Sequence, residues 1–367
     1  MILAIIIFIL IFSFLVLGHE LGHFLAARKV GAKVEEFGLF LPPRIWGKKI
    51  GETIYSINWI PFGGFVKILG ENRDGEGPRS LSSKTPLQKA FVLLSGVGVN
   101  FLIAIILFYI LLGVNGFTTY QSQIFDYQFP IGEQTVYPAI SYIAENSPAQ
   151  LAGLEAHDLI LSVNNEQVKT AEEFVKLMSV NQGNEIVLST INAQTKEEKN
   201  LDIALRVSDK GALGAGITEI SELKYYGISR IFVGPLHTVN MTHLTFSALG
   251  HLISSSLEQG SIDPLADNLT GPVGILAFTK LTLEGGVWQL FYLIAAISLA
   301  LAILNILPIP AVDGGRVVFV IYEAIFKKKF PQKIEYWINV GGFYVLLLLF
   351  FLITIKDIIQ FKDILIK

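Results

Sequence analysis

Five consecutive residues near the amino terminus, His19-Glu20-Leu-Gly-His23, have the types and spacing of a metal-binding motif. On a helix, His19 and His23 lie one turn apart on one face, where two imidazoles can bind one Zn²⁺. Glu20 is next to the first imidazole, where its carboxylate can act as general base on a metal-bound water. The alternative is two capping histidines and a snorkelling glutamate. The position argues against that alternative, because ionisable groups at the end of the apolar run 1–18 are costly in a membrane unless they have a function.

The composition predicts a membrane protein. Hydrophobic residues make up 52% of the chain and charged residues 16%, and the mean hydropathy is +0.54. Charge-free stretches at 90–125, 285–312 and 336–355 can each supply the roughly 20 residues that span a bilayer. The first apolar run has no basic segment before it and no cleavage site, so we expect a retained helix. We predict a polytopic α-helical membrane protein with about four transmembrane helices, over residues 1–24, 90–114, 286–326 and 336–355.

The distribution of charge predicts the orientation of these helices. Residues 25–90 contain 11 Lys and Arg against 6 Asp and Glu, whereas residues 115–285 contain 9 basic and 19 acidic residues. A second basic loop, 327–335, follows the third apolar stretch. By the positive-inside rule, both basic loops face the cytoplasm and the large acidic segment faces outward. The absence of cysteine leaves nitrogen and oxygen atoms as the metal ligands.

A second polar stretch, Asn305-Ile-Leu-Pro308-Ile-Pro310-Ala-Val-Asp313-Gly-Gly315, comes near the end of the third apolar segment. It places Asp313 at about the membrane depth of the two histidines. A carboxylate there needs a partner, and two histidines, one aspartate and a water would form an open, catalytic type of zinc site. Pro308 and Pro310 remove helical hydrogen bonds, which is tolerated only where the backbone lines a cavity or is buried in protein. The alternative is a kinked helix that ends in an Asp-Gly-Gly turn.

Together these motifs resemble those of the site-2 protease family of intramembrane zinc metalloproteases, in its bacterial, PDZ-containing branch (the RseP/RasP type). The resemblance covers most of the chain and includes Gly271-Pro272-Val273-Gly274-Ile275, which precedes the third apolar segment. It implies a zinc ion, a catalytic glutamate and a stretch that contacts substrate. The corresponding residues here are His19, His23 and Asp313 for zinc, Glu20 for catalysis, and Asn305, Pro308 and Pro310 for substrate.

The sequence departs from the family pattern in two places. Phe37-Gly-Leu-Phe-Leu-Pro42-Pro43 stands where the branch often has a Gly-Phe-Gly-Pro type of stretch. Residues 95–100, Ser-Gly-Val-Gly-Val-Asn, are a looser form of the Gly-Pro-x-x-Asn motif of the second helix. Asn100 either faces the site and contacts substrate or makes a polar contact between helices, and the sequence leaves both open.

Residues 52–66, within the cytoplasmic loop 25–89, predict a β-hairpin. β-Forming residues dominate this stretch, and Pro61 with Gly63 and Gly64 supplies a turn. In the family, this hairpin corresponds to a membrane-re-entrant β-element that offers a strand edge to the bound substrate, which would place Gly63 and Gly64 beside it. Such an edge can take over the backbone hydrogen bonds of a substrate helix that is extended for cleavage. A plain solvent-exposed hairpin is the alternative.

The outward segment predicts one α+β PDZ-like domain over residues 137–207. Its stretch 147–164 resembles the helix-turn-strand core of a bacterial PDZ domain, with His157 in place of the usual glycine. A PDZ groove binds a peptide C-terminus or an extended segment by strand addition, so the domain would either gate or recruit substrates. Residues 208–285 predict an amphipathic connector. We expect its His237, His243 and His251 to have interfacial or capping roles, because their spacing does not match one helical face.

We therefore expect a zinc-dependent intramembrane endopeptidase of the bacterial inner (cytoplasmic) membrane. The resemblance implies substrates among single-pass transmembrane proteins, such as anti-sigma factors or signal-peptide remnants; the lipid bilayer is the other expected partner and nucleic acid is not one. Two other classes remain open. A membrane PDZ scaffold with an inert metal site would make Glu20 dispensable. A zinc transporter would need polar residues across its spans, and the charge-free second and fourth stretches argue against that.

Overall fold

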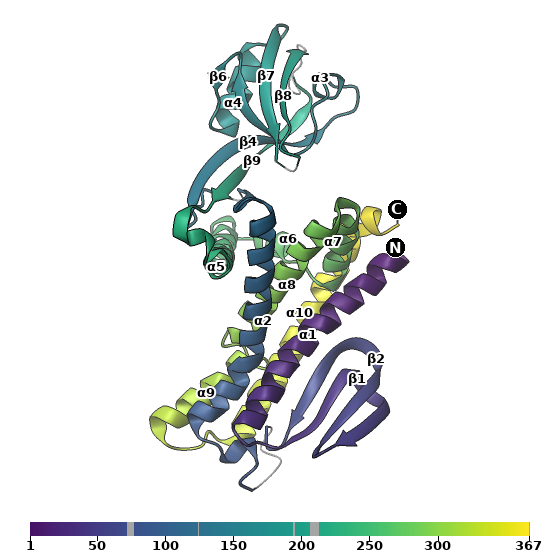
Figure 1. Cartoon of the computed structure of the whole chain (residues 1–367), viewed down its shortest axis with the longest axis vertical. Helices are drawn as coiled ribbons and strands as arrows, with labels where there is room; N and C mark the ends of the chain where they lie inside the picture. Colours follow the sequence, from purple (N-terminus) through teal and green to yellow (C-terminus); the bar gives the residue numbers. More distant parts are fainter. Residues whose placement is uncertain (72–76, 124, 194, 206–212, 367) are drawn as a thin grey trace. The chain divides into compact units, whose positions relative to one another are not determined.

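The computed structural model describes residues 1–71, 77–123, 125–193, 195–205 and 213–366, and divides into two compact units (Figure 1). Parts of the expected loop 25–89 and of the expected connector 208–285 lie outside the described residues. One unit comprises residues 1–111 and 245–367, and the other comprises residues 112–244.

The larger unit is mainly helical. It contains α1 (Ile2–Lys29), β1 (Val34–Ile50), β2 (Thr53–Ile68), η1 (Leu81–Ser83), most of α2 (Pro86–Val114), the second half of α5 (Val233–Gln259), α6 (Asp263–Asn268), α7 (Pro272–Gly285), α8 (Val287–Ile306), α9 (Asp313–Phe326) and α10 (Gln332–Ile366).

Four helices of the described chain are long and apolar enough to cross a membrane: α1, α2, α8 and α10 up to Leu365. This is the number that the sequence predicts. Inside the unit, Ile11 and Leu15 of α1 pack with Ile297 of α8 in one apolar cluster. Large apolar side chains elsewhere on α1, such as Leu10 and Phe14, are exposed. An apolar outer surface of this kind is suited to contact with lipid rather than water.

The third predicted span, 286–326, is not one helix in the structure. α8 ends at Ile306, residues 307–312 form a loop, and α9 begins at Asp313. The cause is Pro308 and Pro310, which have no backbone N–H to donate into a helix. The fourth helix is also longer than 336–355, because α10 continues without a break to Ile366. A buried carboxylate on α10, that of Asp357, accepts the N–H groups of Gly271 (2.9 Å) and Gly274 (2.7 Å) at the start of α7.

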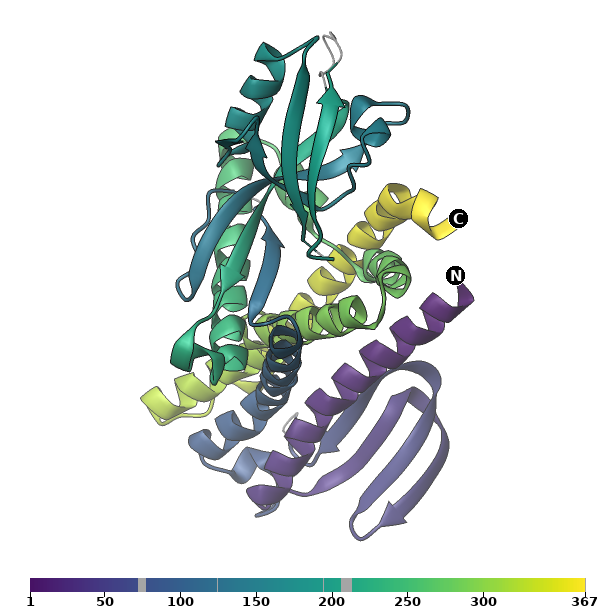
Figure 2. The same ribbon diagram turned by 45° about the horizontal axis from the view of Figure 1, so that its top comes forward.

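β1 and β2 form one antiparallel ribbon that folds back on itself beside α1, as Figures 1 and 2 both show. Phe37 pairs with Tyr55 on one side and with Val66 on the other, so the segments lie in the order 44–50, 53–58, 34–41 and 64–68. The turn of the hairpin is at residues 51–52, where Gly51 has a positive φ of 63°. The sequence predicts a turn at Pro61 and Gly63-Gly64. These residues lie inside β2, at the point where it reverses direction between its segments 53–58 and 64–68, and Gly63 has a positive φ of 69°. They therefore form the fold of the ribbon, and the turn that joins β1 to β2 lies elsewhere.

The smaller unit is built on one antiparallel sheet. Its strands are β3 (Thr118–Ser122), β4 (Glu133–Ile143), β5 (Asp158–Val163), β6 (Glu166–Gln167), β7 (Glu185–Asn192), β8 (Glu198–Ala204) and β9 (Ala215–Lys224). The order is β3-β9-β4-β5-β7-β8, with β6 paired to β5. Two helices accompany the sheet, α3 (Pro148–Leu151) and α4 (Ala171–Val180). Side chains from the strands and from Phe174 of α4 form its buried apolar core.

The boundaries 137–207 predicted for this module are too narrow. β9, which the sequence assigns to the connector, pairs with β4 from Glu133↔Lys224 to Ile143↔Ala215. This ladder is a long-range contact that hydropathy cannot indicate. The exposed His157 has a φ of 71°, which explains why glycine is the usual residue at this turn. The connector itself resolves into β9, a 3₁₀ turn η2 (Gly227–Arg230) and the helices α5, α6 and α7.

Polar side chains attach the first half of α5 to the rest of the smaller unit. The Tyr225 hydroxyl lies 3.0 Å from Nδ1 of His237, and the Tyr127 hydroxyl lies 2.7 Å from Nδ1 of His243. Asn240, between them, donates to the carbonyl of Ile131 and accepts its N–H. His237 and His243 therefore hold the first half of α5 within the smaller unit through hydrogen bonds to two tyrosines.

The buried His237 predicts a pH dependence of stability. Burial lowers its pKa from the ordinary value of 6.5 to about 4. The unfolded imidazole then binds its proton at a higher pH than the folded one. The free energy of unfolding should be constant above about pH 6.5 and should fall by up to about 3 kcal/mol as the pH drops toward 4.

Hydrogen exchange of β9 and of the first turns of α5 in the full chain, corrected for intrinsic exchange, measures this loss of stability. His237→Gln should flatten the profile, whereas His157→Gln, at an exposed histidine, should leave it unchanged. A His237→Gln profile as steep as that of the parent would assign the pH dependence to another group.

Candidate metal centre

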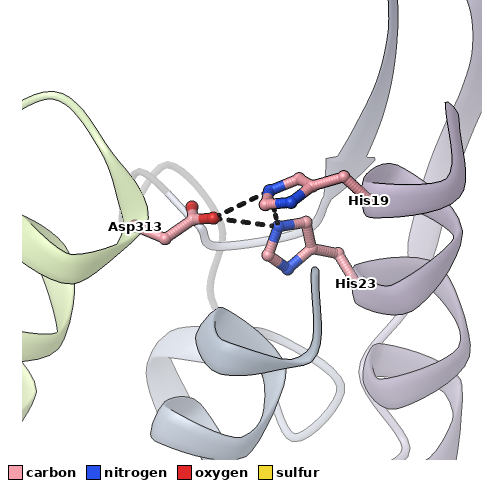
Figure 3. Close-up of side chains that lie close together, drawn as sticks. All are labelled: His19, His23 and Asp313. Atoms are coloured by element: carbon pink, nitrogen blue, oxygen red, sulfur yellow. Dashed lines mark hydrogen bonds and ion pairs between the residues drawn. The ribbon is translucent and has the colours of Figure 1, made fainter. Parts of the chain in front are cut away.

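Two histidines from α1 and one aspartate from α9 converge in the larger unit (Figure 3). Oδ2 of Asp313 lies 2.9 Å from Nε2 of His19 and 3.2 Å from Nε2 of His23. The two Nε2 atoms are 3.0 Å apart. Both histidines are buried, and Asp313 is the first residue of α9, where the helix dipole favours a negative charge. Residues separated by 290 positions in the chain thus form one compact cluster.

The spacing of these three atoms fits a metal ion. Ligands at about 2.1 Å from a tetrahedral Zn²⁺ lie about 3.4 Å from one another. The observed separations of 2.9, 3.0 and 3.2 Å are close to this value. Two imidazole nitrogens and one carboxylate oxygen are also a donor set that zinc accepts. Among the described residues, this is the one group of three or more such side chains that could hold a metal.

Neighbouring groups hold both imidazoles with Nε2 directed at the cluster. Nδ1 of His23 donates to the carbonyl of Val92 on α2 at 2.8 Å. Nδ1 of His19 lies 3.4 Å from the amide nitrogen of Asn100, whose own Oδ1 is buried without a partner. A half-turn of this amide puts its oxygen toward the His19 N–H, which can then donate to it. Partners of this type fix the tautomer and orientation of metal-binding histidines.

Two glycines allow α2 to approach the cluster. A Cβ on Gly96 would lie 2.5 Å from Nε2 of His23 and 2.7 Å from Nε2 of His19. A Cβ on Gly22 of α1 would lie 2.5 Å from the carbonyl oxygen of Ser95. Any larger residue at either position would separate the helices or displace the imidazoles. No sequence pattern distinguishes Gly96 from the other residues of the looser motif 95–100.

The loop between α8 and α9 is held in place by α10. The Ala311 N–H donates to Oδ1 of Asn339 at 3.2 Å, and Pro310 packs closely against Gly342. Gly315 approaches the carbonyl of Ile309 so closely that a Cβ would clash. These contacts set the direction in which the next turn presents Asp313.

A cavity of about 310 Å³ adjoins the cluster. His19, His23 and Asp313 line it together with Glu20, Asn100 and Asn305. Pro308 and Pro310 are not among its lining residues; they shape the loop beside it. Two charged residues that the sequence analysis missed, Glu71 and Arg316, also line the cavity. Arg316 lies one turn after Asp313, and Glu71 lies just after the end of β2. These two positions are the features that could have drawn attention to them.

The hairpin contributes the wall of this cavity that faces Glu20. Oε2 of Glu20 accepts the N–H of Val66 at 2.9 Å. Gly63 and Gly64 lie against Val16 and Leu17 of α1, where a Cβ on Gly64 would be 3.3 Å from Leu17. The small size of these glycines lets β2 approach α1 one turn before Glu20.

Comparisons with known proteins cover nearly the whole chain. The model of peptidase family M50 matches residues 7–349. A relative from Clostridium perfringens that carries a zinc metalloprotease name is 32% identical over 351 residues, or 96% of this chain and 97% of that protein. Zinc metalloprotease RasP from Geobacillus kaustophilus is 25% identical over 438 residues, or 98% of each chain. The PDZ domain of an SdrC-like protein from Listeria monocytogenes is 21% identical, covers 24% of this chain and 90% of that domain, and has a TM-score of 0.20.

Gly96→Ala tests the close approach of α2. The added methyl group would overlap both imidazoles, so we expect bound metal to fall by at least tenfold, as measured by elemental analysis of the purified protein. Gly98→Ala is the matched control, because nothing lies within 4 Å of a Cβ there. In an open helical position this change should retain metal and add about 0.5–1 kcal/mol of stability. Equal metal contents in the two variants would contradict the contact.

Proposed function

The chain belongs to peptidase family M50, a family of zinc metalloproteases, and we propose that it holds zinc through His19, His23 and Asp313. The family confirms the resemblance drawn from the sequence motifs. The observation that carries the assignment of ligands is the separation of about 3 Å among two Nε2 atoms and one Oδ2 atom. Membership in this family of membrane proteases and the four apolar helices together imply proteolysis within the membrane.

Zinc, when bound, would polarise the scissile carbonyl and make a water molecule more acidic. The chain's own residues would do the rest. Glu20, next to His19 and lining the same cavity, would hold the proton taken from water and return it to the leaving amine. Val92 and Asn100 would keep the two imidazoles in the orientation that zinc requires.

The edge of β2 supports an extended substrate. Within the described part of the chain, segment 64–68 pairs with β1 on one side only, and the N–H of Val66 donates to Glu20. A substrate strand along this edge would place its backbone beside the proposed general base. A membrane-spanning helix must lose its internal hydrogen bonds before a peptide bond becomes accessible, and a strand edge replaces those bonds. Gly63, Gly64 and Asn305 would then contact substrate, as the sequence analysis expects.

We further propose single-pass membrane proteins as substrates, with anti-sigma factors and signal-peptide remnants as candidates. The charge asymmetry supports an orientation with the smaller unit outside, and we propose the bacterial inner membrane as the location. The smaller unit has one antiparallel sheet accompanied by α3 and α4. The resemblance of stretch 147–164 to a PDZ core supports binding of a peptide C-terminus or an extended segment. The unit would either exclude bulky outer domains or recruit trimmed substrates.

Asp313→Ala tests the metal ligands. Purified parent protein should contain about one zinc ion per chain, and the variant should lose most of it, because two imidazoles alone bind zinc far more weakly. Asp357→Ala serves as a control for the loss of a buried carboxylate elsewhere, and should keep its zinc. Full zinc retention in Asp313→Ala would remove this residue from the ligand set.

Glu20→Gln tests the general base. The amide cannot take a proton from water, so cleavage of a co-expressed membrane substrate should drop by at least a hundredfold. Zinc content should stay near that of the parent, which separates a catalytic role from a metal-binding one. Turnover near the parent rate would instead support the scaffold function, for which Glu20 is dispensable.

A further inference from the structure

One ion pair lines three cavities of the larger unit. Arg316 of α9 binds the carboxylate of Glu71, which follows the end of β2. Both side chains line the cavity of about 310 Å³ at the metal cluster. Both also line a second cavity of about 560 Å³ along α10, and a third, small one of about 50 Å³. Ala311 is the other residue shared by the two large cavities.

The second cavity, here called the vestibule, is suited to water. Its lining includes the polar side chains of Gln332, Glu335 and Asn339 together with aromatic rings of α10. The cavity of about 310 Å³ at the metal cluster has room for several water molecules. This cavity lies in a unit whose membrane-length helices are strongly apolar. The vestibule offers a polar route that ends at the ion pair.

The ion pair is built to open more easily than a packed apolar wall. The side chains of Arg316 and Glu71 are 30% and 24% exposed, and partly exposed ion pairs are weak because water competes for both charges. Its neighbour, Lys89 with Glu323, is more deeply buried at 12% and 7% exposure and lines only the smallest cavity. Both Arg316 and Glu71 can reach water in the vestibule when they separate.

We propose that the Glu71–Arg316 ion pair is a gate that controls passage of water and small solutes between the vestibule and the metal cavity. When closed, the pair separates the two cavities. When open, it supplies the one water molecule that each hydrolysed peptide bond consumes. Arg316 comes three residues after Asp313, and Glu71 comes three residues after the end of β2. The gate thus links the helix that carries one cluster residue to the sheet whose edge faces Glu20.

The absence of cysteine allows a direct test with introduced thiols. Leu301→Cys puts a probe on the wall of the metal cavity, and Tyr336→Cys puts one in the vestibule. The rate of alkylation by a small, charged methanethiosulfonate is measured on the full chain in detergent micelles. We expect slow labelling at 301 and labelling at least tenfold faster at 336.

Breaking the pair should open the route. In the Leu301→Cys background, Glu71→Gln and Arg316→Met should each raise the labelling rate at least tenfold, whereas Arg316→Lys should stay within threefold of the parent. The double change Glu71→Arg with Arg316→Glu should restore slow labelling. Labelling at 336 should be unchanged throughout.

The matched control is another Arg–Glu pair in the same unit. Arg44 pairs with Glu36 on the hairpin, and neither residue lines the two large cavities. Arg44→Met should leave labelling at 301 within twofold of the parent. Equal rates at 301 in parent, Glu71→Gln and Arg316→Met would overturn the gate, as would an equal rise in Arg44→Met. The assay needs neither substrate nor metal, so its outcome is independent of the proposed proteolysis.

Discussion

The convergence of two imidazoles and one carboxylate in the interior of an apolar helical unit constrains everything else in the larger unit. Isolated ionisable groups at such a position would be costly, and bringing Nε2 of His19 and His23 within about 3 Å of Asp313 gives each a partner. The cluster depends on the break between α8 and α9. The break makes Asp313 the first residue of a new helix, and its carboxylate contacts both histidines from that position.

Small residues make that convergence sterically possible. Gly96 leaves room for both imidazoles where α2 passes the cluster, and Gly22 lets α1 approach the backbone of Ser95. The same device recurs where Gly315 meets Ile309 and where α10 meets Pro310. In a membrane, close backbone approach replaces the hydrophobic effect as the source of helix association. Alanine at these positions would displace the groups of the metal cluster, whereas it would not reduce the buried apolar area.

Hydrolysis inside such a unit requires both an extended substrate and a supply of water. In our proposal the ribbon of β1 and β2 serves the first requirement, with its edge at Val66 beside Glu20. The vestibule and the Glu71–Arg316 pair serve the second in our proposal. The vestibule ends at Arg316, which shares α9 with Asp313, so a movement of α9 would affect the metal cluster and the water route together.

The sequence by itself determined the metal motif, the number of apolar helices and the family, because helical spacing and hydropathy are local properties. Only the tertiary structure decided what depends on distant pairing. It moved the hairpin turn to Gly51, brought β9 into the sheet of the smaller unit, and joined Arg316 to Glu71 across 245 positions. No local pattern encodes such contacts, because each depends on which surfaces meet after the chain folds. For the same reason, Gly96 and Asn100 gained their places beside the histidines only when α2 packed on α1.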